Sequence, residues 1–202
     1  TGSNPFKAYY ALLQGSGLAP KSSYASYKSM LTDFMSYVNY FTPMIFAALA
    51  VAVALRAGLF NIGVSGQMLA AGFTASIIVG YSSLNAVLAK PLVVIIGLIV
   101  GGLVGALIGF LKYRFNINEV VSSIMLNYTF QYVISFFINT FFVDPVSRQS
   151  KEISAASRLT LMDTMVGNLK MDIPLGIILA LLTVVNSFFL PGKGLRSYTV
   201  KV

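Results

Sequence analysis

The 202-residue sequence contains no cysteine and no histidine, and only 10% of its residues are charged. The absence of these two residue types excludes disulfides, thiol redox chemistry, Ser-His-Asp and Cys-His catalysis and almost every zinc site. A soluble domain carries about 25% charged residues, so too few charges remain here to cover a surface in water. We therefore expect an integral membrane protein.

Acidic residues are scarce and form no catalytic pattern. The acids are Asp33, Glu119, Asp144, Glu152, Asp163 and Asp172, and none of them belongs to a spaced metal motif. The segment Gly192-Lys193-Gly194 lacks the upstream glycine and the following Ser or Thr of a phosphate-binding loop. The sequence thus predicts no catalytic residue, no metal and no cofactor, and any energy would come from another subunit.

Apolar residues make up 56% of the chain and gather in about five segments. The segments cover residues 40–55, 66–80, 91–111, 118–143 and 173–190. At 1.5 Å per residue, 91–111 spans about 31 Å, which is enough to cross the hydrocarbon core. This pattern predicts an all-α fold, a polytopic transmembrane helical bundle over 40–202 with an outer loop at 144–172. Residues 1–39 are polar and rich in tyrosine, so we expect an extracytoplasmic, interfacial segment.

Positive charge is unevenly distributed between the connections of these segments. If the segments alternate in direction, residues 56–65, 112–118 and 191–202 share one side and hold six positive charges and no acid. The denser positive set belongs inside the cell, so the net charge of +8 indicates orientation rather than nucleic-acid binding. The chain would then begin outside, which favours a further span upstream and a sequence that is a fragment.

Two periodic patterns lie in the apolar segments. Gly97, Gly101, Gly105 and Gly109 recur every four residues, a spacing that lets another helix approach to backbone contact. We expect them to serve helix packing, and they say nothing of a substrate.

A polar stripe runs along 118–143. It consists of Glu119, Ser123, Asn127, Gln131, Ser135 and Asn139. Contact with lipid would be costly, so the stripe should face other helices or a water-filled path, and the residues do not decide between the two. The position of Glu119 beside Lys112 and Arg114 favours a structural ion pair over proton coupling.

The most informative stretch is 58–67, GLFNIGVSGQ, which interrupts the apolar pattern with three glycines and three polar residues. Non-helical backbone at membrane depth is tolerated only where protein or water satisfies it. In transporters such breaks mark the substrate site, whereas in a simple helical hairpin they are an inside loop. Both interpretations remain open from the residues alone.

Two longer motifs carry a family resemblance. They are LRAGLFNIGVSGQM at residues 55–68 and NEVVSSIMLNY at residues 118–128. Both resemble the membrane permeases of bacterial ABC importers, in the branched-chain amino acid and simple-sugar superfamily. The similarity is to the nucleoside branch, which basic-membrane-protein-type lipoproteins serve. It covers nearly the whole chain, with one departure, since Ser65 stands where the family usually has Glu. It implies that the chain is the first half of an inverted-repeat permease.

The resemblance also implies a function and partners. It implies a multi-pass permease subunit in the bacterial cell membrane, which forms the translocation path for nucleosides. The partners would be a cytoplasmic ABC ATPase subunit, a second permease subunit, an extracytoplasmic substrate-binding lipoprotein and membrane lipid, with no nucleic acid. The implied substrate-path residues are Phe60, Asn61, Ser65, Gln67, Glu119 and Asn127. The amides would hydrogen-bond a sugar hydroxyl or a base edge, and Phe60 would stack on a base.

Three other functions compete with this interpretation. The permease could carry a simple sugar or another small metabolite. The chain could instead be a non-transporting half-permease remnant or a membrane scaffold, which the glycine pattern fits equally well. A membrane enzyme is the weakest alternative, because no nucleophile, base or metal set is visible.

Overall fold

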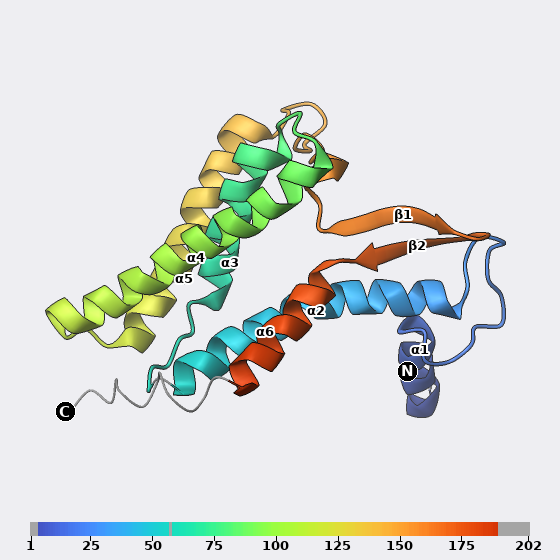
Figure 1. Ribbon diagram of the computed structural model, residues 1–202, viewed down its shortest axis with the longest axis horizontal. Helices are drawn as coiled ribbons and strands as arrows, with labels where there is room; N and C mark the ends of the chain where they lie inside the picture. Colours follow the sequence, from blue (N-terminus) through green and yellow to red (C-terminus); the bar gives the residue numbers. More distant parts are fainter. Residues whose placement is uncertain (1–3, 57, 190–202) are drawn as a thin grey trace. The chain divides into compact units, whose positions relative to one another are not determined.

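The structure is a computed structural model that describes residues 4–56 and 58–189, and it is mostly helical (Figure 1). The helices are α1 (Pro5–Gly15), α2 (Met30–Arg56), α3 (Val64–Ala75), α4 (Ala86–Phe115), α5 (Glu119–Phe137) and α6 (Gly176–Phe189). Two π-helical turns, η1 (Ser76–Gly80) and η2 (Ile138–Phe142), extend α3 and α5, and η3 (Ala155–Ser157) is a 3-10 turn. Strands β1 (Thr160–Val166) and β2 (Leu169–Pro174) form an antiparallel hairpin. The predicted helical fold is confirmed, with this hairpin as an addition.

Among the described residues, three helical stretches are long and apolar enough to cross a membrane. They are Met30–Arg56, Ala86–Phe115 and Glu119–Phe142, while Val64–Gly80 and Gly176–Ser187 are shorter apolar helices. All five lie where an apolar segment is expected, except that residue 190 falls outside the described part. The number of spans, the inverted repeat and the division into 1–39 and 40–202 stay predictions.

Helix α2 begins ten residues before the expected apolar segment 40–55. Residues 30–39 are polar enough to be excluded from a lipid-crossing window, yet they contain neither glycine nor proline to end a helix. Asp33 in the first turn also complements the positive end of the helix dipole. Hydrophobicity therefore located the apolar part of this helix, whereas its start depends on backbone preferences.

The hairpin lies in residues expected to form an outer loop. Its two strands join through Gly167 and Asn168, and Gly167 has a φ of +64°. Glycine at the first central position suits the two-residue turns that match the twist of paired strands. Mixed charge made this segment look like a loop, although Gly-Asn between residues with strand preferences is a hairpin signal.

The chain divides into two compact units, of which the first comprises residues 1–46 and 159–188. Here the hairpin is tied to the N-terminal part of the chain. The backbone N–H of Lys170 donates to the carbonyl of Tyr27 at 2.9 Å, and the hydroxyl of Thr160 donates to Asn39 Oδ1 at 2.7 Å. These bonds join segments more than 100 residues apart, so the hairpin is an integral part of this unit.

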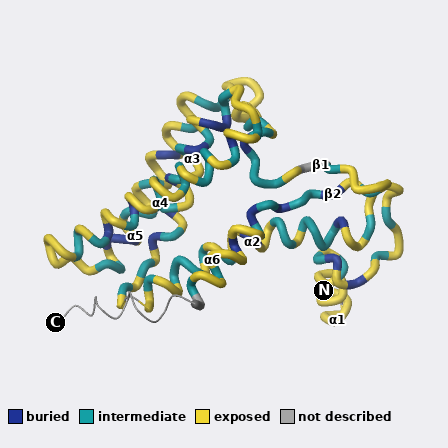
Figure 2. Tube along the Cα trace, in the orientation of Figure 1, coloured by how far each residue is buried: buried dark blue, intermediate teal, exposed yellow. Residues whose placement is uncertain are grey.

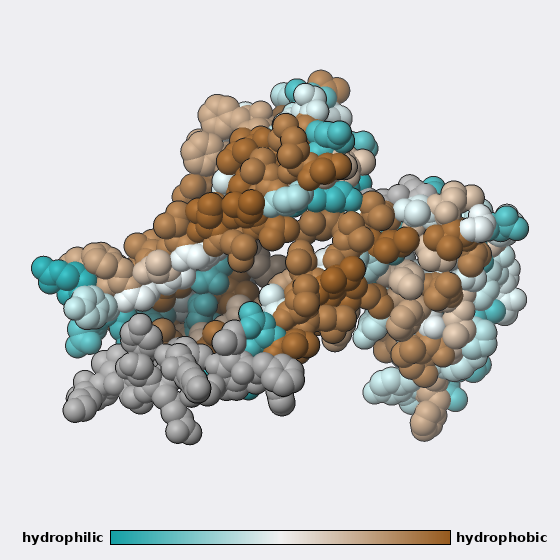
Figure 3. Space-filling view, in the orientation of Figure 1, coloured by the Kyte–Doolittle hydropathy of each residue, from teal (hydrophilic) through white to brown (hydrophobic). Residues whose placement is uncertain are grey.

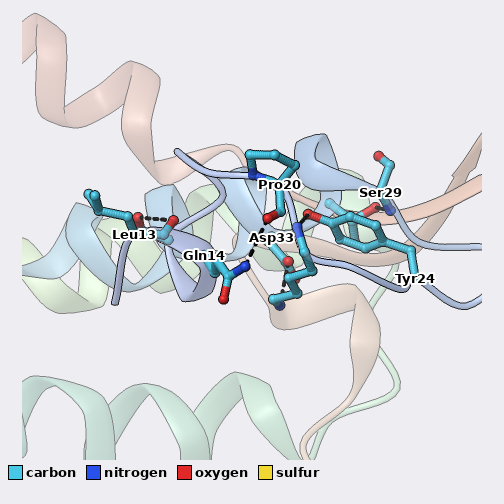
Figure 4. A network of polar contacts seen from close by, with 9 residues as sticks. Leu13, Gln14, Pro20, Tyr24, Ser29 and Asp33 are labelled. Carbon is cyan, nitrogen blue, oxygen red and sulfur yellow. Dashed lines mark hydrogen bonds and ion pairs between the residues drawn. The ribbon is translucent and has the colours of Figure 1, made fainter. Parts of the chain in front are cut away.

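The connection between α1 and α2 is fixed by polar contacts (Figure 4). Gln14 Nε2 donates to the carbonyl of Pro20 at 2.9 Å, and Lys21 forms an ion pair with Asp33. Gly17 lies against the first turn of α2 with a φ of +74°, and a Cβ there would overlap the backbone of Phe34. The turn therefore requires glycine at this position.

The second unit comprises residues 47–158 and 189–202, and its described part is built around α3, α4 and α5. Ala70, Val104 and Ile134, one residue from each helix, form its buried core. Buried stretches lie along all three helices in Figure 2. The outward faces are apolar, since Leu98 and Leu103 of α4 are 71% and 64% exposed. Figure 3 shows apolar colours over most of this bundle and hydrophilic ones towards its ends, which is typical of helices that cross a lipid bilayer.

Candidate substrate path

The break between α2 and α3 starts with a complete helix-ending motif. Gly58 has a φ of +75°, and its N–H donates to the carbonyl of Leu55 at 3.0 Å. The N–H of Leu59 reaches back to the carbonyl of Ala54 at 2.9 Å. This pair of bonds is the Schellman arrangement, which satisfies carbonyls that a helix end leaves free. The sequence ends α2 here because glycine adopts this backbone conformation without strain.

The start of α3 is fixed by Asn61 and Gly63. Asn61 Oδ1 accepts a hydrogen bond from the N–H of Gly63 at 2.7 Å, which forms a local turn. A Cβ on Gly63 would lie 2.9 Å from Ile108 Cδ1 and 3.3 Å from Ser123 Cβ. Gly63 thus lets the break approach α4 and α5 more closely than any other residue would.

Asn127 of α5 joins the break to the bundle. Its Nδ2 donates to the carbonyl of Ile62 at 2.8 Å, and its Oδ1 accepts from the N–H of Gly66 at 2.8 Å. The Gly66 N–H is one of the first donors of α3, which have no partner within the helix. A Cβ on Gly66 would lie only 3.0 Å from the Asn127 Cα. One side chain therefore satisfies two backbone groups of the break, and the backbones of α3 and α5 meet there.

Glu119 lies where the break meets the α4–α5 turn. Its Oε1 is 2.8 Å from Lys112 Nζ, so the expected ion pair is present. The backbone N–H of Phe60 is a further hydrogen-bonding neighbour of this carboxylate. The side chain of Asn118 caps α5 by accepting from the N–H of Val120 at 2.9 Å. These contacts attach the first turn of α5 to the start of the break.

The polar stripe divides into two parts along α5 and η2. Glu119, Ser123 and Asn127 contact the break, and Ser123 is fully buried. Gln131, Ser135 and Asn139 are exposed within the described part of the chain. A four-residue step advances about 40° around a helix of 3.6 residues per turn, so the stripe leaves the face that packs against α3. That face continues instead through Ile134.

The predicted substrate-path residues differ in how they are placed. Phe60 is 47% exposed and Ser65 is also exposed, while Asn61 and Gln67 are half-buried. Asn127 uses both ends of its amide inside the protein, whereas no partner of the Asn61 Nδ2 group occurs among the described residues. The structure thus gathers all six around the break. Sequence reasoning missed Gly63 and Gly66, whose small size allows the close approach, and Ser123, which was placed in the stripe without a role.

The glycine pattern of α4 makes little contact. A Cβ on Gly97, Gly101 or Gly109 would meet no described atom within 4 Å, and one on Gly105 would lie 3.4 Å from Gln67 Nε2. Within the described residues, α4 packs instead through Val104 and Ile108. The expected packing role of the glycines stays a prediction that would need a partner outside these residues.

Long apolar helices and an internally hydrogen-bonded break define a helical membrane protein. The sequence model described as branched-chain amino acid transport system / permease component matches residues 34–190. The chain belongs to this permease family.

Two relatives match most of the chain. The guanosine ABC transporter permease protein NupP of Bacillus subtilis (strain 168) is 34% identical over 192 residues, which are 92% of this chain and 54% of that protein. The nucleoside ABC transporter permease protein NupB of Lactococcus lactis subsp. cremoris (strain MG1363) is 37% identical over 168 residues, 79% of this chain and 45% of that protein. The chain thus spans about half the length of these relatives.

A third relative matches a shorter part. The glucose ABC transporter permease protein TsgB13 of Haloferax volcanii is 31% identical over 96 residues, 48% of this chain and 25% of that protein. No solved structure matches the chain.

Proposed function

We propose that the chain is part of the permease subunit of an ATP-driven importer in a bacterial cell membrane, and that it helps to form a translocation path for nucleosides. The proposal of a nucleoside as the substrate rests on one observation. The relatives that match 92% and 79% of this chain bear the names of guanosine and nucleoside permeases. The permease transports and does not catalyse, so ATP hydrolysis belongs to a partner.

The proposed partners follow from the same family. A cytoplasmic ABC ATPase subunit would supply the energy, a second permease subunit would complete the path, and a lipoprotein would deliver the substrate from outside. The uncovered faces of α4 support contacts with further membrane helices, because Gly97 and Gly101 have no described neighbour.

The break at 58–67 is the proposed contact point with the substrate inside the membrane. Its backbone is held by Asn127, which leaves the aromatic ring of Phe60 exposed and the Asn61 amide with spare donors. A ring and an amide are suited to a nucleoside, which offers a planar base and hydrogen-bonding edges. We assign Asn127 a positioning role and Asn61 a direct one.

Residues 1–39 are proposed to lie at the outer membrane–water interface. Phe6, Tyr9 and Leu12 of α1 are at least 68% exposed, and Lys7 lies among them. An amphipathic surface of aromatic, aliphatic and basic residues is typical of interfacial helices. These 202 residues contain no cysteine, so the substitution Ser26→Cys would give their only site for a membrane-impermeant maleimide, and we expect labelling of intact cells above that of the unsubstituted protein. Asn116→Cys, on the opposite side in the proposed topology, should not be labelled from outside. If the Asn116→Cys protein is labelled and the Ser26→Cys protein is not, the orientation is the reverse of the proposed one.

Uptake of radiolabelled guanosine tests the transport function. Cells with the complete locus should accumulate label, and cells without it should not. Excess unlabelled uridine should block this uptake, whereas glucose, ribose and leucine should leave it unchanged. Blocking by glucose alone would favour the sugar permease that the third relative suggests, and uptake that is independent of the locus would contradict transport.

A further inference from the structure

A cavity of about 300 Å³ lies in the second unit, along α3 and η1 from Met68 to Tyr81 and beside the end of α5. Its lining is mainly apolar and comes from α3, η1, α5, η2 and the segment that follows η2. The lining residues used below are Phe73, Ser76, Tyr81, Phe142, Ser150 and Ile153. Its volume falls at the lower end of the range for small-molecule pockets, about 300–1,000 Å³. We call it the aromatic cavity.

Both π-helical turns contribute residues to the lining of the aromatic cavity. The N–H of Tyr81 donates to the carbonyl of Ser76 at 3.1 Å, and the N–H of Val143 donates to that of Ile138 at 3.1 Å. Each bond spans five residues, so each turn is wider than α-helix. Such turns are rare and often occur at functional sites. Here two of them face the same space.

The segment that follows η2, which also lines the cavity, is held in place by hydrogen bonding and packing. The N–H of Ser154 donates to the carbonyl of Gly80 at 2.8 Å. A Cβ on Gly80 would lie 3.0 Å from Ile153 Cγ2, so this segment is in close contact with the end of η1. A backbone bridge between Val143 and Ser150 closes the connection. The cavity is therefore preformed by ordered backbone.

Three aromatic rings line the aromatic cavity. The rings of Tyr81 and Phe142 are stacked, with centroids 5.6 Å apart and planes at 10°. The ring of Phe73 meets Phe142 edge-on, with centroids 6.0 Å apart and planes at 88°. Flat, mutually supported rings offer a rigid surface on which another planar ring system can stack.

Three hydroxyl groups accompany these rings. The side chains of Ser76, Tyr81 and Ser150 line the cavity and have no hydrogen-bond partner among the described residues. A hydroxyl both donates and accepts, as does the edge of a purine or pyrimidine. An apolar pocket with a few polar groups is the usual composition of a small-molecule site.

We propose that the aromatic cavity binds the base of a nucleoside at its ring-lined end, as a second station of the path beyond the break. The lining begins at Met68, next to the break. At 1.5 Å per residue, the hydroxyl of Ser76 lies about 20 Å along the helix from Gly63. This inference rests on the proposed function. The competing occupant is a lipid acyl chain, which would use the apolar walls but leave the three hydroxyls without partners.

Tryptophan fluorescence tests this inference directly, because the chain contains no tryptophan. The substitution Phe142→Trp places a fluorophore in the wall, and the difference from the unsubstituted permease in lipid nanodiscs isolates its signal. Titration with guanosine should give saturable quenching, with uridine competing and ribose not. A Phe110→Trp permease, substituted on the exposed face of α4, should show no saturable change. If Phe142→Trp fails to fold, Phe73→Trp reports on the same cavity.

Removal of single hydroxyls sharpens the assignment. Tyr81→Phe and Ser76→Ala keep the shape of the wall, and each should raise the guanosine concentration for half-maximal quenching about three- to tenfold. Ser83→Ala, outside the cavity lining, should leave it unchanged. Quenching by brominated acyl chains without any response to guanosine would assign the cavity to lipid and overturn the inference.

Parallel uptake measurements separate the inference from the proposed function. If guanosine uptake depends on the locus but guanosine does not change the fluorescence of the Phe142→Trp permease, nucleoside binding in the aromatic cavity is contradicted. The proposed transport function is then unaffected. Saturable quenching without guanosine uptake would support the binding site and contradict transport.

Discussion

Two sets of glycines in the same bundle have opposite surroundings. Gly63 and Gly66, in the break and at the start of α3, lie close to neighbouring helices: a Cβ on Gly63 would collide with Ile108 of α4, and one on Gly66 with Asn127 of α5. Gly97, Gly101 and Gly109 of α4 show the more regular spacing, yet each faces open space within the described residues. Regular spacing therefore indicates that an approach is possible, and only a partner on the opposite side shows that it occurs.

The largest loss of stability is expected from Asn127→Ala, because Asn127 forms the hydrogen bonds where α5 meets the break and the start of α3. Asn127→Ala leaves the carbonyl of Ile62 and the N–H of Gly66 without their partner. The Gly66 backbone is buried, and an unsatisfied buried group costs about 1–3 kcal/mol. The bond to the Ile62 carbonyl is exposed, so its loss adds only the net value of a hydrogen bond, about 1 kcal/mol. We therefore expect a loss of about 2–4 kcal/mol in unfolding free energy, measured by denaturant titration in micelles, together with loss of uptake.

Asn139→Ala is the matched control for Asn127→Ala. Among the described residues, the Asn139 side chain bonds only the carbonyl of Ser135 one turn away, and it is exposed. The free energy of unfolding should therefore change by less than about 0.5 kcal/mol. A small effect of Asn127→Ala would mean that water reaches the break and satisfies its backbone, which would make the two amides equivalent.

A smaller loss is expected from filling the close approach. Gly66→Ala brings a methyl group to 3.0 Å from the Asn127 Cα and 2.6 Å from its Oδ1. Backbone cannot yield as a flexible side chain can, so we expect about 1–3 kcal/mol of destabilisation and a lower thermal midpoint. An unchanged midpoint would show that α3 and α5 do not touch at this point.

Loss of the Lys112–Glu119 ion pair should reduce stability less than Asn127→Ala or Gly66→Ala does. Its side chains are 39% and 18% exposed, and exposed pairs are worth about 0–1 kcal/mol. Lys112→Met should therefore lower stability by less than about 1 kcal/mol in a salt-dependent way. A complete loss of uptake by the stable Lys112→Met protein would give this pair a role beyond attachment of the break.

The sequence predicted the apolar helices and the break between α2 and α3 better than it predicted the contacts between them. Apolar segments located the helices, and polarity at membrane depth marked both the break and Asn127. Their pairing depends on the register of α3 against α5, with partners 61 and 65 residues apart, so no local pattern encodes it. The exposure of Gln131 follows from helical drift, which is visible in the spacing. The hairpin was missed because its composition resembles a loop, although Gly167-Asn168 marked its turn.

The smallest change in stability is expected from Gly97→Ala, which tests whether another helix packs on the glycines of α4. Gly97→Ala adds a methyl group in open space, and alanine is favoured over glycine within a helix by about 1 kcal/mol. The substituted chain alone should thus be unchanged or slightly more stable in a thermal unfolding experiment. In the assembled transporter, a partner helix in backbone contact would reverse the sign, because the same methyl group would then separate two helices. Equal midpoints for Gly97→Ala and the unsubstituted protein in both states would mean that no helix packs on this glycine, whereas a loss confined to the assembly would place a partner subunit there.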